Sequence, residues 1–185
     1  MFVLLHLFNH MLAWGGIALH QSFMDAFRIL YRHPLGESIL FSLIIAQIIS
    51  GISQIKQIPK AARQQNRLQI YSGLYLLFFL LAHTSAVQIG RYISALDTNF
   101  YFASIVLLDQ SSRLFFIPYY TLGILAFFAH IGTGLRWYLP QQYQKPLVWG
   151  LLGLGLIVAL SIIALFSGWV YDVPRLAEYE KSLLF

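Results

Sequence analysis

Long runs of apolar residues alternate along the chain with short polar segments. Five of these runs are long enough to cross a hydrocarbon core of about 30 Å as helices, and they cover approximately residues 1–20, 36–55, 70–93, 114–138 and 147–171. The pattern therefore predicts an all-α integral membrane protein, a bundle of five transmembrane helices in a single membrane domain, residues 1–185.

Two connecting segments have apolar patterns of their own. Residues 22–33 carry apolar side chains at helical spacing, and residues 94–112 contain the apolar stretch 105–108. Segments of this kind lie in the plane of a membrane interface more readily than they cross the membrane. We expect both to lie along the outer interface, partly as helix.

The composition supports a membrane location. The chain is 58% hydrophobic and 10% charged, whereas soluble domains carry about 25% charged residues. The first apolar run lacks the basic region of a cleaved signal peptide, so we expect it to be retained as a helix. The chain has no cysteine, which excludes disulfides, Cys-ligated clusters and thioether-attached haem. We expect no nucleic-acid partner.

The charges are distributed unevenly between the loops. Cations without any acidic neighbour occupy the second and fourth loops, at Lys56, Lys60, Arg63, Arg67, Arg136 and Lys145. By the positive-inside rule, the N-terminus lies inside and the C-terminus outside. An alternative explanation of the same cations is contact with anionic lipid.

A weak two-helix internal repeat relates the two halves of the chain. Residues 46–52 align with residues 129–135, and residues 2–6 resemble residues 78–83. Repeats of this kind often form a cofactor site at their interface.

Two histidines lie deep within apolar runs, His83 in the third and His130 in the fourth. An ionisable ring at bilayer depth is costly unless it is paired or binds a ligand, and imidazole is the usual axial ligand of haem iron. At 1.5 Å per residue, His83 lies about 20 Å along its helix and His130 about 12 Å from the inner end of its own. These depths differ, so two separate sites are predicted.

The partner of each histidine follows from depth and from the repeat. For the outer site, the partner of His83 at comparable depth comes from the first run, where His10 is nearer in depth and His6 less near. For the inner site, the repeat pairs His130 with Gln47, which is not a haem ligand. We therefore predict that His83, His10, His130 and His6 are the candidate ligands of haem b iron, with one, two or no haem groups bound. The alternative role is an interhelical hydrogen bond. His20 and His33 are expected to be solvated at the outer interface.

The segment from Tyr71-Ser72-Gly73-Leu74 to His83 resembles the third helix of the membrane anchor, cytochrome b, of succinate dehydrogenases and fumarate reductases. The sequence from His130 to Gly134 and Arg136 resembles the His-x-x-x-Gly-x-Arg motif of that family's fourth helix. The similarity covers about residues 34–140. It implies five helices with the N-terminus inside, and a flavoprotein and an iron–sulfur subunit docked on the inner face. It also implies quinone as the electron partner, in a bacterial cytoplasmic or mitochondrial inner membrane.

A quinone ring needs hydrogen-bond donors at the membrane interface beside apolar surface. Ser72, Arg136 and Trp137 provide such donors at the inner side and are the candidate quinone-binding residues. The alternative is that Ser72 caps a helix and that Arg136 extends its charge to the interface.

These observations favour a non-catalytic anchor subunit of a complex II-like oxidoreductase, with no catalytic residue in this chain. Two alternatives stay open at this stage. One is a non-redox scaffold of a respiratory complex, and the other is a stand-alone transmembrane haem b electron carrier.

Overall fold

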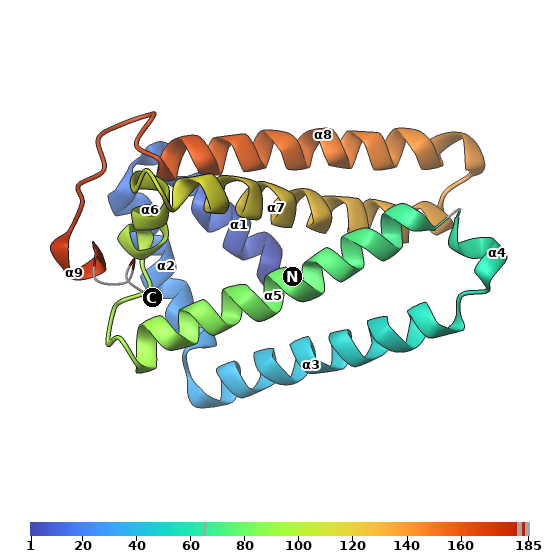
Figure 1. Cartoon of the computed structure of the whole chain (residues 1–185), viewed down its shortest axis with the longest axis horizontal. Coiled ribbons are helices and arrows are strands. Elements are labelled where there is room, and N and C mark those ends of the chain that lie inside the picture. The colour runs from blue at the N-terminus through green and yellow to red at the C-terminus, as the bar shows by residue number, and fades with distance from the viewer. Residues whose placement is uncertain (65, 181–182, 184–185) are drawn as a thin grey trace.

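Four long helices form the body of the molecule. A computed structural model describes residues 1–64, 66–180 and 183, and this part of the chain is helical, without strands. The long helices are α3 (Pro34–Gln57), α5 (Arg67–Tyr92), α7 (Arg113–Leu135) and α8 (Gln141–Phe166). They lie lengthwise and alternate in direction along the chain (Figure 1). All four are long and apolar enough to cross a membrane, which indicates a membrane-embedded protein.

The shorter helices lie toward the two ends of this bundle, and α1 extends between one end and the middle (Figure 1). At one end lie α1 (Phe2–Leu12), η1 (Ala13–Gly15), α2 (Ile17–Tyr31), α6 (Phe100–Leu108) and α9 (Ala177–Glu180). At the other lie α4 (Lys60–Arg63) and η2 (Arg136–Tyr138). All seven acidic residues occur in segments of the first end, which we call the acidic end. The other end, with the cations of residues 56–67 and 136–145, is called the basic end.

The first apolar run is not one continuous helix over residues 1–20, and a count of five spanning helices is not confirmed. The run breaks at Gly16, whose φ of 104° is a conformation that L side chains rarely adopt. Tyr171 stabilises the break because its hydroxyl donates a hydrogen bond to the Ala13 carbonyl, 3.0 Å away. The resulting α1 has 11 residues and is only about 16 Å long. The predicted inside location of the N-terminus depends on this run and is likewise not confirmed.

The segment 94–112 is partly helical, as predicted, and its position relative to the membrane stays a prediction. It contains α6, which packs against α7 and α8. Phe100, Ile105 and Leu107 of α6 are buried, and the Asn99 side chain caps the helix by accepting hydrogen bonds from Tyr101 N and Phe102 N. Burial of its apolar side chains against the two long helices holds α6 inside the acidic end.

Helix α3 packs least. It has no buried residue and contacts chiefly α2 and α5, whereas α7 contributes eight buried residues to the interior. The two helices that the internal repeat relates therefore have different environments.

The Asp109 side chain caps the turn between α6 and α7, and this cap predicts acid sensitivity. The carboxylate accepts hydrogen bonds from Ser112 N at 2.8 Å and Ser111 Oγ at 2.7 Å. These hydrogen bonds lower the pKa of Asp109 from 3.8 to about 2. Since the folded-state pKa is the lower one, the stabilisation is complete above about pH 4 and is lost as pH falls toward 2.

We expect the melting temperature of the detergent-solubilised protein to fall less steeply below pH 4 in Asp109→Asn than in the wild type. Glu178→Gln, which removes an exposed carboxyl group, is the matched control and should follow the wild type. Parallel pH profiles for all three proteins would contradict the capping role.

Candidate functional site

Four histidines from three helices meet inside the acidic end. His6 and His10 lie on α1, His20 on α2 and His83 on α5. The turn at Gly16 folds α2 back against α1, which places His20 beside His10 with ring centroids 5.4 Å apart. The His6 and His83 rings have centroids 6.0 Å apart. We call these residues the histidine cluster.

Hydrogen bonds link three of the four rings into a chain. His10 Nε2 lies 3.2 Å from His6 Nε2, and His10 Nδ1 lies 3.2 Å from His20 Nε2. Both ring nitrogens of His10 are therefore engaged. In a neutral imidazole one nitrogen donates and the other accepts. His10 therefore donates a hydrogen bond to one of these two neighbours and accepts one from the other.

The amide of Asn9 sets that direction. Asn9 is buried, and its Nδ2 donates to His20 Nε2 at 3.3 Å. His20 Nε2 is then an acceptor, so His10 Nδ1–H also donates to it and His10 Nε2 accepts from His6 Nε2–H. This assignment follows the amide orientation. It leaves His6 Nδ1 with a free lone pair.

His83 is free to bind a ligand. Neither ring nitrogen of His83 makes a hydrogen bond to another described residue, although the ring stacks on Phe79 at a centroid distance of 5.4 Å. His6 and His83 are both half-buried. Among the described residues, no three His, Asp or Glu side chains are grouped to hold a metal ion.

His20 does not lie where the sequence predicted. It is 1% exposed and packs against the rings of Phe100 and Phe166, so the expectation of a solvated His20 is wrong. His33 is exposed, as predicted, and its Nδ1 accepts a hydrogen bond from Leu35 N at the start of α3.

His130 occupies a separate position between α5 and α7. Its Nδ1 lies 3.4 Å from Ser72 Oγ and 3.3 Å from the Gln69 carbonyl oxygen. Gly73 allows this approach, since a Cβ there would lie 3.1 Å from His130 Cε1. Gln47, the partner that the repeat indicated, is exposed on α3. His130 thus makes the interhelical hydrogen bond that was the alternative to haem ligation.

The three candidate quinone-binding residues are placed differently from one another. Ser72 is buried and donates to the Gln69 carbonyl. Arg136 donates from Nη2 to Asn66 Oδ1 at 2.9 Å, and its guanidinium carbon lies 4.7 Å from the centroid of the exposed Trp137 ring. Arg136 is the one of the three that lines a pocket.

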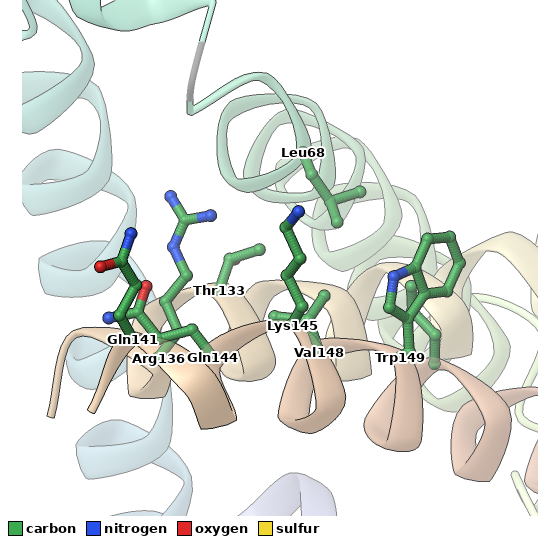
Figure 2. Close-up of a pocket in the computed structure, with 9 residues that line it drawn as sticks. Leu68, Thr133, Arg136, Gln141, Gln144, Lys145, Val148 and Trp149 are labelled. Carbon is green, nitrogen blue, oxygen red and sulfur yellow. The ribbon is translucent and has the colours of Figure 1, made fainter. Parts of the chain in front are cut away.

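This pocket lies at the basic end between α5, α7 and α8, and has a volume of about 290 Å³. Figure 2 shows Arg136 and Lys145 extending to the same side of it, with Trp149 beside Lys145. The other lining residues are Leu68, Thr133, Gln141, Gln144, Val148 and Leu152. We call it the basic pocket.

Sequence reasoning missed His20 in the histidine cluster and Lys145 in the basic pocket. The adjacent glycines Gly15 and Gly16 were a signal for a turn that returns the chain toward His10. The proximity of Lys145 to Arg136 follows from the short connection between α7 and α8. Comparison of the chain with known protein families, curated proteins and solved structures finds no match.

Proposed function

We propose that this chain is a membrane anchor that binds one haem b between α1 and α5 and carries electrons for partner subunits. The observation that carries the proposal is the pairing of His6 of α1 with His83 of α5, whose ring centroids lie 6.0 Å apart. Lone pairs on neutral imidazoles are what haem iron requires of its axial ligands.

The separation of the two rings suits this role. His6 and His83 would hold the haem iron through ring nitrogens, since imidazole nitrogens bind metals at about 2 Å. His6 and His83 have centroids 6.0 Å apart. His10 fits less well because both its nitrogens are used by His6 and His20.

Haem b, when bound, supplies a one-electron redox centre at this position. The protein's own residues orient its ligands. His10 accepts from His6 Nε2–H, which fixes the tautomer and ring orientation of His6, as hydrogen bonds to the second nitrogen of ligating histidines do. Phe79 stacks on His83 and restrains its ring. The apolar rings of Phe2 and Phe166 beside His6 and His10 exclude water.

The resemblance to complex II anchors supports the remaining parts of the proposal. In that family a flavoprotein and an iron–sulfur subunit dock on the inner face, and quinone is the electron partner. The basic end, which the positive-inside rule places inside, presents exposed cations on the loop side, including Lys56 and Arg63. The chain is then a non-catalytic subunit of a bacterial cytoplasmic or mitochondrial inner membrane complex.

The test is a dithionite-reduced minus oxidised spectrum of the full chain, purified in mild detergent from a host supplied with haem precursor. We expect a sharp b-type α-band. A monodisperse, helical preparation that shows no such band would contradict the proposal.

A second function, a non-redox scaffold, is favoured by a specific observation. His6, His10 and His20 satisfy one another through hydrogen bonds, and His130 pairs with Ser72. These contacts stabilise the bundle without any cofactor. A haem-free protein that still co-purifies with soluble redox subunits would support this function over the first.

A further inference from the structure

We propose that the basic pocket binds the phosphate group of an anionic phospholipid. This inference concerns the end of the molecule opposite the histidine cluster and does not depend on haem binding. It rests on the charge of the pocket, on its unpaired hydrogen-bond donors and on its combination of polar and apolar lining residues.

The pocket has cations without counter-ions. Arg136 and Lys145 line it from η2 and α8, and no carboxylate occurs in residues 38–96 or 110–171, the segments that build the basic end. The ion pairs among the described residues all belong to the acidic end, such as Arg28–Asp97 and Arg91–Glu37. A phosphate oxyanion would supply the missing negative charge in a partly desolvated position.

Arg136 also retains donor capacity. One terminal nitrogen donates to Asn66, while Nε is buried without a hydrogen-bond partner among the described residues. Buried donors are almost always paired in folded proteins. The side-chain amides of Gln141 and Gln144, on the first turn of α8, add further donors around the same space.

Part of the pocket lining is apolar. Leu68 of α5 and Val148 and Leu152 of α8 line it, together with Trp149, whose ring is 71% exposed. Exposed tryptophans at span ends mark the headgroup level of a bilayer. A volume of about 290 Å³ accommodates a headgroup and glycerol, with the acyl chains continuing along the exposed apolar surface of α8.

The chemistry of the pocket discriminates between classes of occupant. A quinone ring is neutral, so it would leave two cations unpaired. Basic pockets between transmembrane helices on the inner side of a membrane are known to bind anionic lipid headgroups. The presence of both cationic and apolar lining residues therefore favours a phospholipid.

The test is native mass spectrometry of the full chain in detergent, titrated with phosphatidylglycerol. We expect discrete lipid adducts, and about fivefold weaker binding for each removed charge, in Arg136→Gln and Lys145→Gln, with about 30-fold weakening in the double variant. The double variant Arg136→Lys with Lys145→Arg retains both charges and should bind within about fivefold of the wild type. Lys56→Gln, an exposed cation of the same end, is the matched control and should bind like the wild type.

Any of the following outcomes would overturn the assignment of an anionic phospholipid to the basic pocket. Equal weakening by Lys56→Gln would mean general attraction to a basic surface, and equal retention of phosphatidylcholine would remove the role of net negative charge. Inorganic phosphate is a third titrant. If it bound as tightly as phosphatidylglycerol with the same dependence on Arg136 and Lys145, the ligand would be a free phosphate. If an acidic partner subunit bound to these residues and excluded lipid, the site would be a protein interface.

Discussion

Replacing His83 with alanine is expected to remove b-type haem from the purified protein. His83 contributes a ring with two free nitrogens, and none of the other described residues on α5 offers an imidazole to the histidine cluster. Changes to residues that merely orient a metal ligand cost about 10–100-fold in affinity, so loss of a ligand should weaken haem binding by more than about 100-fold. The measurement is the haem-to-protein ratio from the reduced minus oxidised spectrum.

Three further histidine variants make this prediction specific. His6→Ala should lose haem as His83→Ala does, because His6 is the paired ligand. His10→Ala should retain haem with a shifted reduction potential, since His10 acts through His6. His130→Ala is the matched control and should retain an unchanged spectrum, because His130 bonds to Ser72 and Gln69 at a separate position. Loss of haem in His10→Ala with retention in His6→Ala would reassign the ligand to His10.

Replacing Phe100 with alanine is expected to destabilise the acidic end strongly. Phe100 is fully buried, and its ring packs against Phe166 at 4.3 Å and His20 at 5.2 Å between centroids. Removal of a buried phenylalanine ring costs about 3–5 kcal/mol because it loses contacts and leaves a cavity. Equilibrium unfolding in mixed micelles should show this decrease in the free energy of unfolding.

Phe115→Ala is the matched control for this variant. Phe115 lies on α7 and is 56% exposed, so its removal should change the free energy of unfolding by less than about 1 kcal/mol. Equal effects of the two substitutions would contradict the burial of Phe100 against Phe166 and His20. Such a result would also contradict the role of Phe100 packing in holding His20 next to His10.

The apolar runs determined the four long helices because a membrane-spanning helix requires about 20 consecutive apolar residues. This requirement is local, so it is readable without knowledge of the fold. The uneven charges of the loops likewise separated a basic end from an acidic end. His83 and His130 were identified by the cost of an ionisable ring in an apolar run, and His10 and His6 were identified as partners of His83.

The tertiary structure decided what these elements form together. The Gly16 turn divides the first run and returns His20 to His10, and the Tyr171 hydroxyl donates a hydrogen bond at this turn to the carbonyl of Ala13, 158 residues away along the chain. Helix α6 enters the interior because α7 and α8 leave a surface that its apolar side chains cover. Hydropathy carries no information on such long-range contacts. The sequence therefore determined which four segments form helices long and apolar enough to cross a membrane and which end is basic. Packing alone decided which histidine rings come together and which cations share a pocket.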